Sequence, residues 1–124
     1  MVTGTRILVV DDSEHSRWVL ADVLKAQGHT VHTASDGKWA WLLLCRAWFS
    51  YDLVVTDLVM PEMNGIELLT RIRADCPWIK VVLITAHTDP EVRSRALMLG
   101  AFAVLSKPCD VEQLRGMVEL ALAK

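Results

Sequence analysis

Five short strand-like runs, most of them apolar and each followed by a stretch with helical periodicity, are the feature that most limits the folds open to this chain. The runs lie at residues 6–10, 30–34, 53–56, 79–84 and 102–105. Most of them are too continuously apolar to have one face in water, which is typical of parallel strands covered by helices on both faces. The alternation therefore predicts an α/β fold, a doubly wound parallel sheet of five strands.

Capping residues mark where the helices between these strands begin and end. Ser13 and Asp110 are good N-cap residues, and Asp89-Pro90 is a strong helix start. Gly28 and Gly100 follow two of the helical stretches, at the position where a glycine ends a helix. These signals predict five helices, with the second over residues 38–48 and the third over residues 65–75.

Length, charge and cysteine content exclude several classes of protein. The chain has 124 residues, 52% of them hydrophobic, which predicts one globular domain over residues 1–124. A net charge of −2 argues against nucleic acid as a direct partner, and no apolar run is long enough to span a membrane. There is no apolar signal segment, and Cys45, Cys76 and Cys109 lie far apart in the sequence. These three cysteines form no metal-ligand pair and no disulfide framework, so we expect a cytoplasmic protein.

Polar residues follow four of the predicted strands at the points where the strands end. Asp11 and Asp12 follow the first, Asp57 the third, Thr85 the fourth and Lys107 the fifth. Because these ends meet at one edge of a parallel sheet, we expect the side chains to converge there. The plainer interpretation of Asp57 alone is that it caps a turn, since Pro61 forces residues 58–64 into a loop.

Converging carboxylates repel one another unless a cation neutralises them, and Mg²⁺ is a cation that prefers oxygen ligands. A lysine and a threonine beside such a site would suit an incoming phosphoryl group. Aspartate can act as the nucleophile for that group and form an aspartyl phosphate. The strand ends thus predict an acidic, Mg²⁺-dependent phosphoryl-transfer site around Asp57.

The chain resembles the receiver domain of two-component response regulators. Four segments carry the resemblance in order, ILVVDDS, TDLVMPEMNG, VVLITAH and LSKP, and together they cover essentially the whole chain. The resemblance implies a flavodoxin-like fold with strand order 2-1-3-4-5. It implies that Asp57 accepts a phosphoryl group from a phosphohistidine on a histidine kinase or a histidine phosphotransfer protein.

The same resemblance implies roles for the neighbouring residues. Asp11 and Asp12 would bind Mg²⁺ together with Asp57 and the backbone carbonyl of Val59. Thr85 and Lys107 would hold the phosphate oxygens. Movement of Thr85 toward the phosphate would repack the surface of the fourth helix, fifth strand and fifth helix, where an output domain or effector protein would bind.

Two positions depart from the family pattern, and two more leave alternatives open. Val104 stands where the family usually has a switch aromatic, and Cys109 follows Lys-Pro where phenylalanine is common. Val59 has no group to orient an attacking water, which favours a long-lived phosphate, whereas His87 could order such a water. The sequence does not choose between these two effects.

The predicted second helix, with its continuation KWAWLLLCRAWFS over residues 38–50, is unusually rich in aromatic residues. Trp39, Leu42, Arg46 and Phe49 share the face opposite to the one predicted to contact the sheet. Large aromatics with an arginine are typical of interface hot spots, so this face is a candidate docking surface for a partner, another domain or a second copy forming a homodimer. Alternatively, Trp39 and Phe49 cover the edge of the sheet as part of the core.

The sequence therefore predicts a signalling module and not a metabolic enzyme: it would catalyse only its own phosphoryl transfer and dephosphorylation. A second interpretation is a pseudo-receiver that acts as a phosphorylation-independent interaction module, which Val104 favours and the intact acidic site opposes. A phosphatase of the dehalogenase type fits poorly, because Asp57 is followed by Leu58-Val59 instead of the DxDxT pattern. The sequence ends at Lys124 without an output domain, so a stand-alone regulator and a piece of a longer one both remain open.

Overall fold

A computed structural model describes residues 5–47, 51–60, 62–86 and 89–123 of the protein. Its strands are β1 (Arg6–Val10), β2 (Thr30–Ala34), β3 (Leu53–Thr56), β4 (Lys80–Thr85) and β5 (Ala103–Ser106). Its helices are α1 (Glu14–Ala26), α2 (Gly37–Ala47), α3 (Gly65–Asp75), α4 (Pro90–Met98) and α5 (Val111–Leu122). Each predicted strand and helix is present, and the boundaries of β4, β5 and α2 differ from the prediction by one residue.

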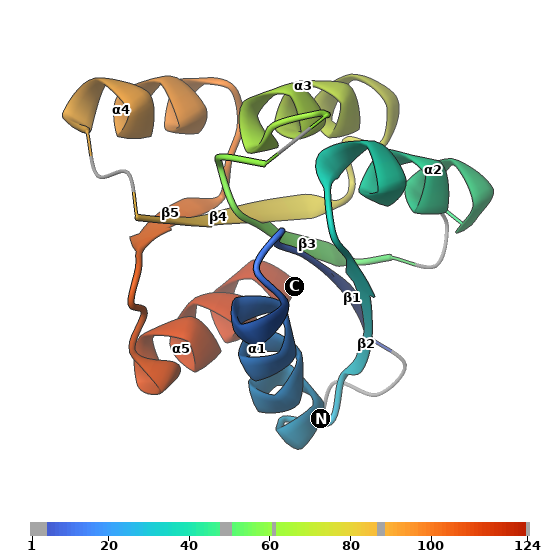
Figure 1. The fold of residues 1–124 in the computed structure, drawn as a ribbon, viewed down its shortest axis with the longest axis vertical. Helices are drawn as coiled ribbons and strands as arrows, with labels where there is room; N and C mark the ends of the chain where they lie inside the picture. The colour runs from blue at the N-terminus through green and yellow to red at the C-terminus, as the bar shows by residue number, and fades with distance from the viewer. Residues whose placement is uncertain (1–4, 48–50, 61, 87–88, 124) are drawn as a thin grey trace.

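All neighbouring strands pair in parallel, in the order β2-β1-β3-β4-β5. Helices α1 and α5 cover one face of the sheet, and α2, α3 and α4 cover the other (Figure 1). The predicted flavodoxin-like order is therefore confirmed. Because β2 lies on one side of β1 and β3 lies on the other, the strand order reverses between β1 and β3. These two strands therefore end at the switch point where such sheets bind ligands.

Two hydrophobic clusters, one on each face of the sheet, hold these layers together. Along β1, Ile7 and Val9 pack with α1 and α5, whereas Leu8 and Val10 pack with α2 and α3. All four side chains are fully buried. Burial of such a side chain contributes about 2 kcal/mol, so the central strands are the most firmly fixed part of the fold.

The helix caps show why the helices start where they do. The Ser13 side chain accepts a hydrogen bond from the Ser16 amide, and Asp89 and Asp110 cap α4 and α5 in the same way. Asn64 forms a reciprocal capping box with Glu67 at the start of α3. These caps place the first turn of each helix at the carboxyl edge of the sheet, where the strand ends also lie.

Not every apolar residue on the sheet-facing helices is buried. Val19 on α1 and Val111 on α5 have exposed fractions of 37% and 42%. Val111 is the first residue of α5 and precedes the part of the helix that packs on β5 through Leu114 and Val118. Helical spacing identifies a face of a helix but not how much of its length the sheet covers.

On α2, Ala40 and Leu44 are buried, while Trp39 and Leu42 are 49% and 45% exposed. The exposed face predicted for this helix is therefore present as far as these two residues show. Phe49, the remaining aromatic residue of that face, lies outside the described residues. The docking role proposed for the face stays a prediction.

Candidate functional site

Three carboxylates meet at the carboxyl edge of the sheet. Asp11 and Asp12 directly follow β1, and Asp57 directly follows β3, the strand that pairs with β1. The Asp57 amide donates to the carbonyl of Val10 at 2.9 Å, which extends the pairing of β1 with β3 as far as Asp57 itself. One oxygen from each carboxylate lies within 4.8 Å of the others, so the predicted convergence of these three residues is present.

Asp11 is the most deeply buried of the three, with a side chain that is 1% exposed. Its Oδ1 accepts the Ser13 amide at 2.9 Å, and its Oδ2 accepts Lys107 Nζ at 2.8 Å. Its backbone carbonyl accepts Arg17 Nη1 at 2.7 Å. A buried carboxylate needs such donors to offset the loss of hydration, so Asp11 is held in one orientation from both sides.

Asp57 is less buried, with a side chain that is 12% exposed. Its Oδ1 accepts the Leu58 amide at 2.7 Å, and its Oδ2 accepts Lys107 Nζ at 2.8 Å. The Thr56 hydroxyl donates to the Asp57 carbonyl at 2.9 Å, and the Gly65 amide donates to the Leu58 carbonyl at 2.8 Å. These bonds close the loop between β3 and α3 around the carboxylate.

Lys107 joins the fifth strand to the acidic cluster. It follows β5, and its amide donates to the Thr85 carbonyl at 2.9 Å. Burial alone would lower the pKa of Lys107, but its hydrogen bonds to Asp11 and Asp57 and their charges raise the pKa above 10.5 overall. The ammonium group therefore stays charged at neutral pH, and three carboxylates around one cation leave two negative charges in excess.

Thr85 ends β4 directly beside Ser106 of β5, and it is 1% exposed. The predicted site residue Val59 lies in the β3–α3 loop, two residues beyond Asp57, and is 53% exposed. Val104, at the position of the expected aromatic, lies on β5 beside Leu83 of β4. Its side chain is buried under the helices that cover one face of the sheet. His87 lies outside the described residues.

Two contacts at the site are absent from the sequence-based prediction. Arg17 reaches from α1 to the Asp11 carbonyl, and Lys107 bridges Asp11 and Asp57 directly. A basic residue one turn into a helix that starts beside an acidic pair is a signal for the first contact. No sequence pattern indicates the second, since it joins residues 96 and 50 positions apart.

The donor set suits a hard divalent cation. Asp11, Asp12 and Asp57 supply only oxygen ligands, Asp12 is exposed to solvent, and the excess negative charge would be neutralised by Mg²⁺. The described residues contain no second cluster of three or more acidic, histidine or cysteine side chains near enough together to hold a metal ion. Within the described residues, no helix has the length and apolar content that crossing a membrane requires.

Comparisons with known proteins identify relatives along nearly the whole chain. The response regulator receiver domain family matches residues 7–119. The transcriptional regulator AlgB of Pseudomonas aeruginosa is 40% identical over 96% of this chain, and AtoC of Escherichia coli is 37% identical over 98%. These alignments cover 25% and 26% of the two relatives, so the chain spans about a quarter of their length.

Solved structures agree with this similarity. A receiver domain protein from Clostridium thermocellum is 30% identical, with a TM-score of 0.90 over 95% of this chain and 94% of its own. The chemotaxis complex CheX–CheY–BeF3–Mg+2 from Borrelia burgdorferi is 27% identical over 97% of this chain and 90% of its own, with a TM-score of 0.92. Sequence and fold agree, and the chain belongs to the response regulator receiver domain family.

Proposed function

We propose that this receiver domain takes a phosphoryl group onto Asp57 from a phosphohistidine of a histidine kinase or histidine phosphotransfer protein, with Mg²⁺ as cofactor. The observation that carries the proposal is the cluster of Asp11, Asp12 and Asp57, whose oxygens lie within 4.8 Å of one another beside Lys107. A structural role alone would not favour three crowded carboxylates, since each raises the cost of ionising the others.

In the proposed transfer, a carboxylate oxygen of Asp57 attacks the phosphorus atom while the bond from phosphorus to the donor imidazole nitrogen breaks. The imidazole leaves with the electron pair of that bond and takes up a proton. Lys107, now 2.8 Å from Asp57 Oδ2, would move its ammonium group onto a phosphoryl oxygen. Asp11 would keep the other side of Lys107 in place through its bond to Nζ.

A bound Mg²⁺ would offset the charge that develops on the transferring oxygens. Asp11, Asp12, Asp57 and the backbone carbonyl of Val59 are the proposed ligands. Support comes from the acidic cluster itself and from the Borrelia neighbour, which is a complex with Mg+2. The phosphoryl chemistry would be limited to the domain's own modification and its reversal, so the protein would not be a metabolic enzyme.

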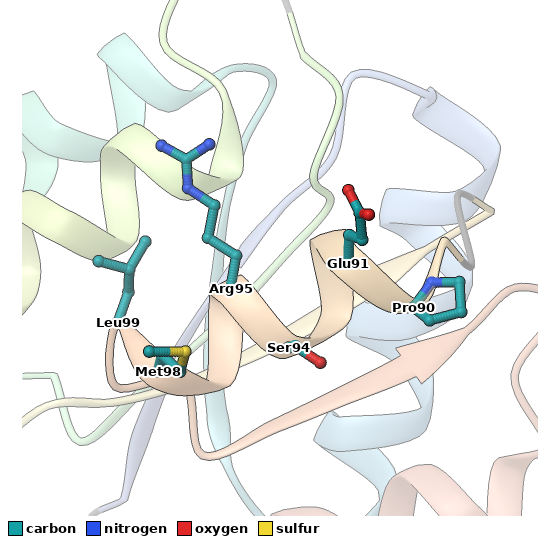
Figure 2. Close-up of a pocket in the computed structure, with 6 residues that line it drawn as sticks. All are labelled: Pro90, Glu91, Ser94, Arg95, Met98 and Leu99. Atoms are coloured by element: carbon teal, nitrogen blue, oxygen red, sulfur yellow. The ribbon is translucent and has the colours of Figure 1, made fainter.

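Phosphorylation would alter the surface formed by α4, β5 and α5, where an output domain or effector would bind. Thr85 ends β4 at this side of the site, and α4 has an outer hollow of about 470 Å³ that includes Arg95, Met98 and Leu99 (Figure 2). Met98 is 87% exposed. Because Val104 lacks a ring, the proposed switch would act through Thr85 and α4 without an aromatic rotamer change.

The test is to incubate the protein with Mg²⁺ and acetyl phosphate and to measure its intact mass. We expect one added phosphate on the parent and none on Asp57→Asn. Asp22→Asn, at an exposed position on α1, is the matched control and should gain phosphate like the parent. Absence of phosphate on the parent, with Mg²⁺ binding demonstrated separately, would favour the interaction-only pseudo-receiver.

A further inference from the structure

Two of the three cysteines line one pocket at the far ends of α2 and α3. The pocket has a volume of about 300 Å³ and is lined by Trp41, Leu44, Cys45, Asp75, Cys76 and Trp78. Both cysteines are free thiols, 31 positions apart in the sequence. Because the two cysteines lie far apart in the sequence, the sequence alone predicts no pairing between them.

The packing of α2 against α3 explains why the two thiols line the same pocket. The helices follow parallel strands on the same face of the sheet, so they run side by side in the same direction (Figure 1). The Arg71 guanidinium of α3 lies 5.7 Å from the ring centroid of Trp41 on α2. Four residues further along both helices, a rise of about 6 Å, lie Cys45 and Asp75, which line the pocket together with Cys76.

The two thiols have different surroundings. Cys45 is exposed, while Cys76 caps α3 and is 5% exposed. Burial raises the pKa of the Cys76 thiol, and the nearby Asp75 and Cys45 raise it further. Cys76 is therefore protected from bulk reagents and mostly protonated at neutral pH, whereas Cys45 can meet a dissolved oxidant directly.

We propose that Cys45 and Cys76 form a reversible intramolecular disulfide when the protein meets a hydroperoxide. The Cys45 thiolate would attack the peroxide, forming an S–O bond and breaking the O–O bond, so that the sulfur becomes a sulfenic acid and an alcohol or water is released. Cys76 sulfur would then attack the Cys45 sulfur, forming the S–S bond and breaking the S–O bond. The departing hydroxide takes the Cys76 proton and leaves as water, so two thiols lose two electrons and the peroxide gains them.

The disulfide would tie the end of α2 to the end of α3. Helix C-termini in this fold lie at the edge of the sheet opposite to Asp57, because each helix runs back antiparallel to its strand. The closed loop would contain all of β3 and α3, so the bond should raise the melting temperature by restricting the unfolded chain. This inference does not rest on the proposed phosphorylation, and each can fail without the other.

The experiment treats the fully reduced protein with hydrogen peroxide at low protein concentration and follows intact mass and the number of alkylatable thiols. We expect the parent to lose about 2 Da and two of its three thiols, and dithiothreitol to restore both. Peptide mapping should identify a crosslink between Cys45 and Cys76. Cys109→Ser is the matched control, because Cys109 lines a different hollow beside Lys107, and it should behave like the parent.

Cys45→Ser and Cys76→Ser should show no such crosslink. Cys76→Ala, with circular dichroism to verify folding, guards against a folding defect at this buried position. A parent that only gains oxygen atoms, or that crosslinks between molecules, would overturn the proposal. So would a Cys76→Ala protein that still loses about 2 Da, because the bond would then involve Cys109.

Discussion

At the scale of single residues, Lys107 is the cation that pairs with two carboxylates of the site. Its ammonium group separates Asp11 from Asp57, and the two carboxylates are 1% and 12% exposed. Without that cation, a buried charge would be left unpaired, which costs more than an exposed ion pair contributes. Lys107 therefore stabilises the metal-free fold as well as serving the proposed chemistry.

We predict that Lys107→Met lowers the free energy of unfolding in metal-free buffer by about 2 kcal/mol, measured by urea denaturation. Adding Mg²⁺ should recover part of this loss, because the metal would neutralise the same carboxylates. Lys25→Met, at an exposed position in the last turn of α1, is the control and should change stability by less than about 0.5 kcal/mol. Equal stability of the two variants would contradict the role assigned to Lys107.

The raised pKa of Lys107 also predicts how this contribution depends on pH. Burial lowers that pKa, but the bonds and charges of Asp11 and Asp57 raise it more, so the folded value lies above the unfolded value of 10.5. The stabilisation is then complete below pH 10.5 and is lost as the pH rises through the folded pKa. The parent should approach the stability of Lys107→Met in that range; Tyr51, whose pKa burial raises, titrates in both proteins and cancels in the difference.

At the scale of structural elements, the β3–α3 loop depends on a close approach at Gly65. A Cβ atom there would overlap the carbonyl oxygen of Asp57 and lie 2.9 Å from the Leu58 Cα. Gly65 is buried and is the first residue of α3. Because Gly65 has no side chain, the β3–α3 loop can fold back beside Asp57.

Two glycine substitutions test this interpretation. Gly65→Ala should destabilise the protein by about 2 kcal/mol and lower phosphate gain at Asp57, since the backbone of the acceptor must shift. Gly116→Ala is the matched control: it lies in α5 with open space around the added Cβ, and should stabilise by about 0.5–1 kcal/mol through helix propensity. Urea denaturation measures both, and a Gly65→Ala protein as stable as the parent would contradict the close approach.

Helix α4 is attached more weakly than its neighbour α3. Among the described helix residues, α4 buries only Ala96, whereas α3 buries Gly65, Leu68, Leu69 and Ile72. Fewer buried apolar contacts mean a lower free energy of local opening. We predict that α4 amides exchange with deuterium at least about tenfold faster than α3 amides; equal protection would contradict the α4-based switch.

At the scale of the whole molecule, most of the fold could be predicted from the sequence because local signals agree with one another. Continuous apolar runs predict the strands, and caps such as Ser13, Asp89 and Asp110 predict the helix starts. A parallel sheet places its strand ends on one edge, so the convergence of Asp11 and Asp57 follows from the order of elements.

Features that depend on packing between distant segments were not predictable in this way. Helical spacing could not show that Val111 is exposed, and the odd cysteine count gave no hint that Cys45 and Cys76 share a pocket. The bridge from Lys107 to two carboxylates likewise depends on side-chain positions at three strand ends. Sequence patterns describe faces and turns, whereas these contacts depend on how the layers meet.

The central claim is that Asp57 itself carries the phosphoryl group, and the most direct measurement locates it chemically. The protein is treated with acetyl phosphate and Mg²⁺ and then reduced with borohydride, which converts an acyl phosphate to an alcohol, before peptide sequencing by mass spectrometry. We predict homoserine at position 57 and unchanged aspartate at Asp11 and Asp12. Reduction at another acidic residue, or a phosphate that resists borohydride as a serine or threonine ester would, contradicts the account.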